Sequence, residues 1–154
     1  QALRCQVEKT QRFIPQCAQS LPAAIGSQTR MQTGCSDAAS VLDSAEVILV
    51  AVPTQHIRAV LIGMPAELGS HAPVVSLAKG LEQSTGQRPS EIIAAVLGNP
   101  QRAFVLSGPS HAEEIAHGKP TTVVVAGPGD DALMRLQTAL QTDRFRVYRN
   151  QDLL

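Results

Sequence analysis

The stretch "DSAEVILVAVPTQHIRAVL", residues 43–61, decides the fold class. Its apolar run over residues 47–52 shows no alternation with polar residues, which is typical of a strand covered on both faces in a parallel sheet. Pro53 ends the run, and residues 54–68 then show helical spacing with a break at Pro65. A buried strand followed directly by a helix predicts a β–α unit.

The same alternation continues along the chain. Further strands are predicted at 73–78, 102–108, 121–127 and 145–150, and further helices at 36–45, 88–98, 109–118 and 130–141. Residues 1–35 are less regular and predict a loop with a short strand at 29–34. Strands separated by helices favour one α/β domain with a doubly wound, mostly parallel, Rossmann-like sheet.

Composition excludes several function classes. The 154 residues carry 13 basic and 13 acidic side chains, so the formal net charge is zero and no basic patch indicates nucleic acid or an anionic membrane. The apolar runs are far shorter than the roughly 18 residues of a membrane span, and no signal peptide is visible, so we expect a cytoplasmic protein. Three unpaired cysteines (Cys5, Cys17, Cys35) are interpreted as free thiols.

Three predicted strand ends carry unusual residues, at 50–55, 77–80 and 106–110. Ligands of open α/β sheets bind beyond the carboxyl ends of the strands, where loops and helix N-termini converge. Lys79 at such an end is placed to meet an anion or to polarise a carbonyl oxygen, and Gly80 lets a ligand approach. The alternative is a lysine on an exposed loop that keeps its charge in water.

The loop after the third of these strands has two interpretations. Gly108 opens the backbone, and Pro109 or Ser110 is expected to begin a helix whose free amides bind an anion. The alternative is an ordinary helix cap at Ser110, with Glu113 and Glu114 complementing the helix dipole.

Other chemistries are less well supported. His111, Glu114 and His117 do not have metal-binding spacing, because residues six apart on a helix point about 120° apart. His56 and His71 stand alone and are interpreted as solvated or satisfied side chains. No G-x-S-x-G elbow is present, and Ser110 has no evident general base, which argues against a hydrolase.

The chain contains no G-x-G-x-x-G and no G-x-x-x-x-G-K-[ST] motif. A domain with a dinucleotide-like crevice therefore lacks its phosphate loop. Either the domain is of another kind, or its first strand, loop and helix lie upstream of Gln1.

From about residue 8 to the end, the chain resembles the amino-terminal domain of NAD(P)-dependent glycerol-3-phosphate dehydrogenase of the bacterial type. The most specific block is "SGPSHAEEIAHGKPT", then "AKGLE", whereas "VAVPTQ" is shared more widely. The other matching stretches are "RFIP", "DSAEVILVAVPTQHIRAVL" and "FRVYRNQDLL".

The resemblance implies reduction of dihydroxyacetone phosphate to sn-glycerol 3-phosphate with NAD or NADP as cofactor, for phospholipid biosynthesis. It assigns three residues to the substrate: Lys79, Gly108 and Ser110. It assigns four to the cofactor: Lys79, Ala112, Pro53 and His56. It implies no metal.

The resemblance also implies that residues 1–154 form a partial NAD(P)-binding domain. The glycine-rich loop would precede Gln1, and the proton-donating lysine would lie in a helical substrate domain after Leu154, so we expect no turnover by the chain as given. The alternatives are another two-domain dehydrogenase, of the ketopantoate reductase or hydroxyacid type, or a non-catalytic nucleotide-binding module. The residues leave open the choice between NAD and NADP and the oligomeric state, with a homodimer of the complete chain as one candidate.

Overall fold

The structure is a computed structural model and describes residues 42, 45–64 and 71–153. The described strands are β1 (Ile48–Val50), β2 (Val74–Ser76), β3 (Ala103–Ser107), β4 (Thr121–Ala126) and β5 (Phe145–Asn150). The described helices are α4 (Thr54–Ile62), α5 (Pro89–Leu97), the 3-10 helix η1 (Pro100–Arg102), α6 (Ala112–Ala116) and α7 (Asp130–Leu140). The strand predicted at 29–34 and nearly all of the helix predicted at 36–45 lie outside the described residues.

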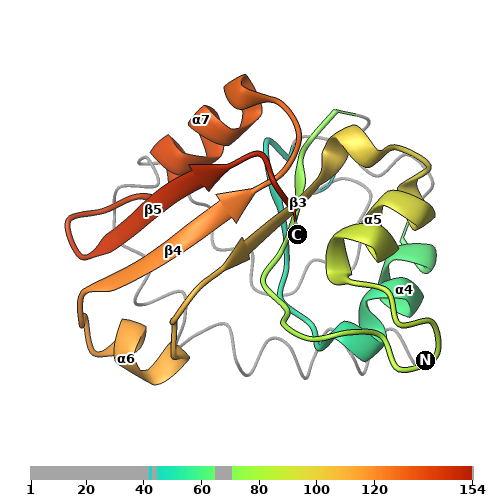
Figure 1. Ribbon diagram of the computed structural model, residues 1–154, viewed down its shortest axis with the longest axis horizontal. Helices are drawn as coiled ribbons and strands as arrows, with labels where there is room; N and C mark the ends of the chain where they lie inside the picture. The colour runs from blue at the N-terminus through green and yellow to red at the C-terminus, as the bar shows by residue number, and fades with distance from the viewer. Residues whose placement is uncertain (1–41, 43–44, 65–70, 154) are drawn as a thin grey trace.

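The five strands form one sheet in the order β1-β2-β3-β4-β5, shown in Figure 1. β1, β2 and β3 are parallel to one another, and β4 and β5 are parallel to each other. The predicted α/β class with a mostly parallel sheet is therefore confirmed.

One pairing differs from the expected succession of parallel strands. β4 runs antiparallel to β3, with Val105 opposite Ala126 and Ser107 opposite Val124. The physical reason is that the connection between them holds only the five-residue helix α6, which stays at the edge of the sheet instead of crossing back over a face (Figure 1). The segment 109–118 is thus a return loop with a short helix, not a crossover helix.

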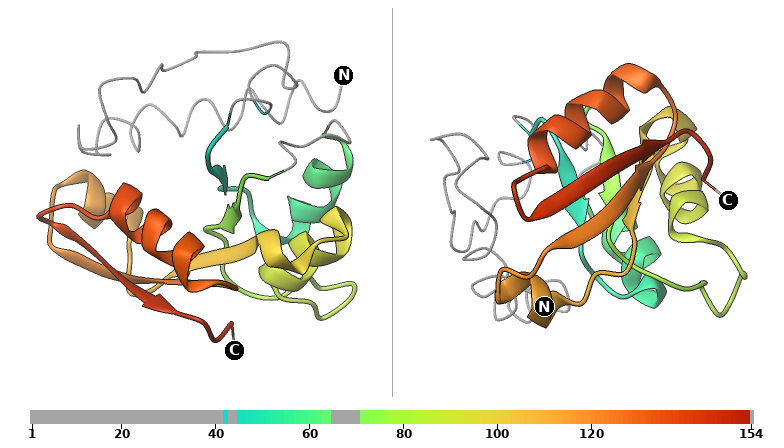
Figure 2. Two further views of the ribbon diagram at one scale, coloured as in Figure 1. Left: turned by 90° about the horizontal axis from the view of Figure 1, so that it is seen from above. Right: turned by 60° about the vertical axis from the view of Figure 1, so that its left-hand side comes forward.

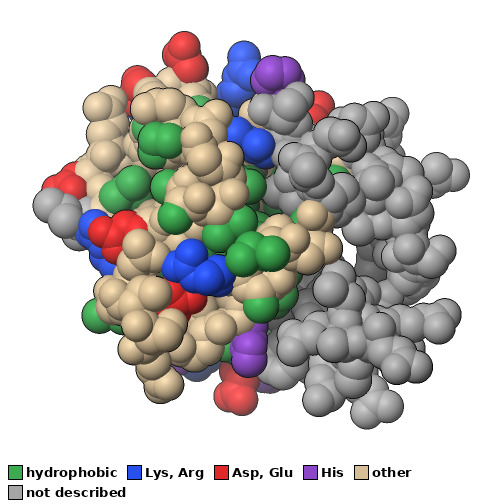
Figure 3. All heavy atoms as spheres, turned by 90° about the vertical axis from the view of Figure 1, so that its right-hand side faces the viewer, with side chains coloured by type: hydrophobic (Ala, Val, Ile, Leu, Met, Phe, Trp, Pro, Cys, Tyr) green, Lys and Arg blue, Asp and Glu red, His purple; other side chains and the backbone are tan. Residues whose placement is uncertain are grey.

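Helices α4 and α5 cover one face of the sheet. They pack against each other, and α5 packs against β3 and β2 (Figure 2). The core on this face consists of Ile48, Val50, Ile57, Leu61, Ala72, Val74, Ile92, Ile93 and Ala103. Figure 3 shows the outer side of this region, where basic and acidic side chains lie among hydrophobic ones.

Helix α7 covers the opposite face along β4 and β5 (Figure 1). The core on this face consists of Val75, Phe104, Val123, Val125, Leu133, Leu136 and Val147. All three residues of β2 are buried, as expected for a strand covered on both faces. β1 departs from that expectation, because Leu49 is 41% exposed while its two neighbours are buried and β1 lies at the edge of the described sheet.

Helix boundaries follow local chemistry. α4 ends at Ile62, before the break expected at Pro65. α5 ends where predicted, at Gly98, which adopts the left-handed conformation with φ of 61°. At its start, the Glu91 carboxylate accepts a hydrogen bond from the backbone N–H of Arg88, which satisfies one of the free amides of the first turn.

Among the described residues, none of the helices has the length and apolar character that a membrane span requires.

Candidate functional site

The carboxyl ends of β1, β2 and β3 lie at one edge of the sheet because these strands are parallel. The loops that leave them are joined by hydrogen bonds through Lys79. The hydroxyl of Thr54, after β1, donates to the carbonyl oxygen of Lys79 over 2.8 Å. The ammonium Nζ of Lys79 donates to the carbonyl oxygen of Gly108, after β3, over 2.7 Å. The structure thus brings together the three strand ends that the sequence singled out.

The Lys79 side chain is exposed, and it reaches across to the loop after β3. An ammonium group has three N–H donors, and the bond to Gly108 uses one of them. A cation held at one side by a carbonyl oxygen can direct its other donors toward an anionic or carbonyl group of a ligand. Gly80 follows it with φ of 93°, and a Cβ added there would meet no atom within 4 Å.

The carbonyl oxygen of Gly108 is also approached by Ser110, whose backbone N–H and hydroxyl donate to it over 2.8 and 3.3 Å. A glycine is required at this position because the loop runs close to β4. A Cβ on Gly108 would lie 2.9 Å from the carbonyl oxygen of Thr122 and 3.0 Å from the Cα of Val123.

The start of α6 corrects the prediction that Pro109 or Ser110 begins the helix. α6 begins at Ala112, and His111 is its N-cap residue without a side-chain capping bond. Ser110 lies one residue before this N-cap, and its N–H and hydroxyl both donate to the carbonyl oxygen of Gly108. A helix of five residues has a small dipole, so it gives no support to the interpretation of this helix end as an anion site.

Two side chains at α6, those of Glu114 and of the C-cap residue His117, have local partners. Glu113 and Glu114 lie in its first turn, as the capping alternative predicted. Glu114 pairs with Lys119 at 3.2 Å, and Nδ1 of His117 lies 2.6 Å from the carbonyl oxygen of Glu113. In residues 42, 45–64 and 71–153, no group of three or more His, Cys, Asp or Glu side chains could hold a metal ion.

The remaining predicted cofactor residues, Pro53, His56 and Ala112, are all exposed. Pro53 is the N-cap residue of α4, and its carbonyl accepts the first helical bond from the N–H of His56 over 2.8 Å. Ala112 is the first residue of α6, in the loop region after β3. Pro53 and His56 therefore follow β1, and Ala112 follows β3. The loop that carries Lys79 follows β2, which lies between these two strands.

Three residues that bind this loop to α4 were missed by sequence reasoning: Gln55, Arg58 and Glu82. Gln55 donates to the carbonyl oxygen of Leu81 over 2.8 Å and accepts from the N–H of Gln83 over 2.9 Å. The guanidinium of Arg58 donates to both carboxylate oxygens of Glu82, with the shortest contact at 2.8 Å. The available signal was that Glu82 is the only acidic residue between 71 and 90.

Glu82 is a buried carboxylate with 4% of its surface exposed. The hydrogen bonds from Arg58 and then from Thr85 hold the pKa of Glu82 below its ordinary value. The same pairing raises the pKa of Arg58. The pair is therefore fully ionised at neutral pH, and its charges satisfy each other inside the loop.

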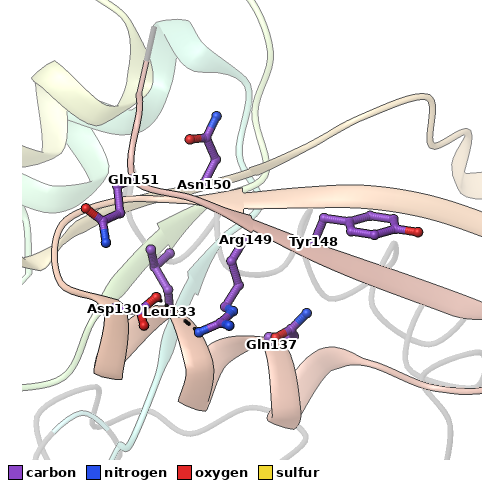
Figure 4. A pocket seen from close by; sticks show the side chains of 7 residues that line it. All are labelled: Asp130, Leu133, Gln137, Tyr148, Arg149, Asn150 and Gln151. Carbon is purple, nitrogen blue, oxygen red and sulfur yellow. Dashed lines mark hydrogen bonds and ion pairs between the residues drawn. The ribbon is translucent and has the colours of Figure 1, made fainter.

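A groove of about 540 Å³ lies elsewhere, between α7 and β5 (Figure 4). Its lining includes the ion pair of Asp130 and Arg149, whose side chains lie 3.1 Å apart. Because β4 and β5 run opposite to β3, the carboxyl end of β5 faces the opposite edge of the sheet from Lys79. This groove is separate from the strand ends that the sequence indicated.

The fold and the joined loops define a class: doubly wound α/β domains that bind ligands at the carboxyl edge of the sheet. The family can be stated more closely. A family model described as NAD-dependent glycerol-3-phosphate dehydrogenase N-terminus matches residues 16–132, and the chain belongs to this family. The resemblance stated from the sequence is confirmed, and the match favours this family over the other two-domain dehydrogenases.

Curated relatives agree with this assignment. A glycerol-3-phosphate dehydrogenase [NAD(P)+] of Syntrophomonas wolfei is 42% identical over 135 residues, which cover 86% of this chain and 39% of the relative. An enzyme of the same name from Geobacillus kaustophilus is 41% identical over 123 residues, which cover 79% of this chain and 36% of the relative. The chain therefore spans well under half the length of these relatives.

Solved structures show the same fold. The crystal structure of glycerol-3-phosphate dehydrogenase from Coxiella burnetii aligns with a TM-score of 0.64 and 31% identity, over 76% of this chain and 35% of that one. The enzyme of Plasmodium falciparum aligns with a TM-score of 0.68 and 26% identity, over 77% of this chain and 33% of that one.

Proposed function

We propose that this chain is the cofactor-binding part of an enzyme that reduces dihydroxyacetone phosphate to sn-glycerol 3-phosphate with NAD(P)H. The observation that carries the proposal is the Lys79 ammonium, held 2.7 Å from the Gly108 carbonyl where three strand ends meet. The family assignment supports it, because relatives about 40% identical are named as glycerol-3-phosphate dehydrogenases.

In this proposal, Lys79 binds both the substrate and the cofactor. NAD(P)H supplies the hydride to the C2 carbonyl of the substrate. The C2 oxygen gains negative charge in that step, and an ammonium already fixed beside it stabilises that charge without having to reorganise. The bond from Thr54 to the backbone of Lys79 keeps the ammonium at the carboxyl edge of the sheet.

Gly108 and Ser110 are proposed to hold the phosphate-bearing end of the substrate. The hydroxyl of Ser110 makes only a long bond of 3.3 Å to Gly108, so it can turn to a phosphate oxygen at small cost. Gly108 contributes by letting the loop approach β4 closely, and its carbonyl oxygen accepts hydrogen bonds from both Ser110 and Lys79.

The described residues can contact the part of the cofactor that lies near the substrate, but not its pyrophosphate. Pro53, His56 and Ala112 are exposed around the Lys79 loop, and the space next to Gly80 is open. The chain contains no G-x-G-x-x-G motif, so no described residue is assigned to the cofactor pyrophosphate. We propose that this loop and the proton-donating lysine belong to further parts of the polypeptide, with residues 1–154 as part of the NAD(P)-binding domain.

The proposal has consequences for the cell. The product would supply the glycerol backbone of phospholipids. We place the protein in the cytoplasm, where dihydroxyacetone phosphate and NAD(P)H occur. A homodimer is one candidate for the oligomeric state of the full-length polypeptide, and light scattering will distinguish it from a monomer.

The test is oxidation of NADH and of NADPH by the full-length polypeptide that carries these residues, with and without dihydroxyacetone phosphate. Oxidation that depends on the substrate would support the proposal and reveal the preferred cofactor. A folded full-length polypeptide that oxidises neither cofactor would overturn it and favour another two-domain dehydrogenase, of the ketopantoate reductase or hydroxyacid type.

A further inference from the structure

The loop that carries Lys79 is bound to α4 through side chains of that helix. Thr54, Gln55 and Arg58 lie in the first two turns of α4. Their hydrogen bonds reach the backbone at Lys79, the backbone on either side of Glu82, and the Glu82 carboxylate itself. One helix therefore holds the loop at four positions, namely residues 79, 81, 82 and 83.

The strongest of these attachments is the pair of Arg58 and Glu82, called here the Arg58–Glu82 clamp. Two guanidinium nitrogens donate to two carboxylate oxygens, an arrangement that fixes orientation as well as distance. The Glu82 side chain is 5% exposed, and that of Arg58 is 31% exposed. A buried carboxylate cannot exchange this partner for water, so the clamp resists loop movement.

Hydrogen bonds within residues 82–87 also hold the turn that contains Glu82. The N–H of Glu82 donates to the carbonyl oxygen of Gln87 over 2.9 Å, and the N–H of Gly86 donates back to Glu82 over 2.7 Å. Thr85 donates its hydroxyl to the Glu82 carboxylate, and Gln87 accepts from Arg58. Glu82 thus takes part in the hydrogen bonds that hold residues 82–87 together. It lies three positions after Lys79 in the chain.

We propose that Glu82 is a positioning residue, which with Arg58 fixes the loop so that the Lys79 ammonium lies at the Gly108 carbonyl. Glu82 touches neither substrate nor cofactor in this proposal and acts only through Lys79. The inference rests on the proposed function for its kinetic test, whereas its structural test does not depend on that function.

The kinetic test is a double-mutant cycle in the full-length polypeptide, made of Glu82→Gln, Lys79→Ala and the double variant. If Glu82 acts through Lys79, Glu82→Gln lowers kcat/KM between about 10- and 100-fold when Lys79 is present, because a misplaced group loses that much rate. In the Lys79→Ala background the same change has an effect below about twofold, since the positioned group is already gone. Equal effects in both backgrounds, or no effect in either, would overturn the inference.

The structural test measures how fast acetic anhydride acetylates Lys79 relative to Lys119 in the same molecule, read by mass spectrometry. Lys119 pairs with Glu114 and serves as the internal reference. Loosening the loop in Glu82→Gln frees the Lys79 amine from Gly108, so the ratio rises. An unchanged ratio would overturn the inference even if the polypeptide reduces no substrate, which separates its failure from that of the proposed function.

Two further variants keep these tests decisive. Arg58→Lys retains a cation beside Glu82 but loses the two-pronged geometry, and it replaces Glu82→Gln if that variant does not fold. It is expected to raise the acetylation ratio and to lose its effect on kcat/KM in the Lys79→Ala background. Glu91→Gln breaks the comparable pair with Arg88 on α5 and is the matched control, expected to leave the ratio and kcat/KM unchanged.

Discussion

The ammonium of Lys79 lies 2.7 Å from the carbonyl oxygen of Gly108, although the two residues are 29 positions apart in the chain. This bond connects the loops after two parallel strands and orients the cation along the carboxyl edge of the sheet. Gly108 is itself fixed against β4, where no room exists for a Cβ. The position of the cation therefore depends on the packing of β3 against β4 as well as on its own loop.

Replacing Lys79 by alanine tests its role in the proposed reaction. In the full-length polypeptide, Lys79→Ala is expected to remove about 2 to 4 kcal/mol of transition-state stabilisation, as loss of an oxyanion-type donor does. The measurement is kcat/KM for dihydroxyacetone phosphate, with Lys119→Ala as the control lysine. An unchanged kcat/KM would contradict the assigned role.

Ser110 is expected to act on the substrate more than on the fold. Its hydroxyl contributes only the 3.3 Å bond to Gly108, so Ser110→Ala is expected to leave the melting temperature nearly unchanged. The KM for the phosphate substrate is expected to rise, because one phosphate donor is lost. Steady-state kinetics with each substrate varied in turn will show this, and an effect confined to cofactor affinity would refute the placement.

Gly108→Ala tests the close approach to β4. The new Cβ would lie 2.9 Å from the carbonyl oxygen of Thr122, so the variant is expected to lose about 1 to 3 kcal/mol of the free energy of unfolding, a range typical of overpacking. Denaturant unfolding measures the loss. Gly63→Ala is the control, because Gly63 is exposed and its φ of −77° is one that alanine adopts without strain. It is expected to lose less; the reverse order would show that β3 and β4 are not so closely packed at Gly108.

The start of α5 predicts a pH dependence of stability. Hydrogen bonds from the side chain and then the backbone of Arg88 lower the pKa of Glu91 from 4.5 to about 2. Since the folded-state pKa is the lower one, this carboxylate stabilises the fold above its unfolded pKa, and the contribution is lost as the pH falls through its folded pKa.

The corresponding measurement compares unfolding midpoints of the wild type and Glu91→Gln at a series of pH values. The advantage of the wild type is expected to be full near neutral pH, to shrink as the pH falls below 4.5, and to vanish near pH 2. An advantage that does not change over this range would show that Glu91 is not paired in the folded state.

A side chain of α7 forms a hydrogen bond with the backbone of β5. The amide of Gln137, on α7, donates to the carbonyl oxygen of Val147 over 2.6 Å. Gln137→Leu is expected to lose about 1 kcal/mol of the free energy of unfolding, because this strand carbonyl then lacks its partner. Gln141→Leu, one helical turn later, leaves the bond in place and is the control. Equal stability of the two variants would count against the bond.

The sequence by itself determined what depends on neighbours along the chain. Continuous apolar runs placed most of the strands, and the helix predicted over 88–98 ended as predicted because Gly98, directly after Leu97, supplies a left-handed C-cap. Lys79 could be placed at a strand end because the apolar run of β2 stops shortly before it. The resemblance in "SGPSHAEEIAHGKPT" identified the family from the same local order of residues.

Only the tertiary structure decided which loops meet and in which direction the strands run. The antiparallel pairing of β3 and β4 follows from the length and path of the connection, which periodicity does not report. The bond from Lys79 to Gly108 and the Arg58–Glu82 clamp join residues more than 20 positions apart. Such bonds depend on three-dimensional distance and shared burial, and neither is encoded in the spacing of residue types along the chain.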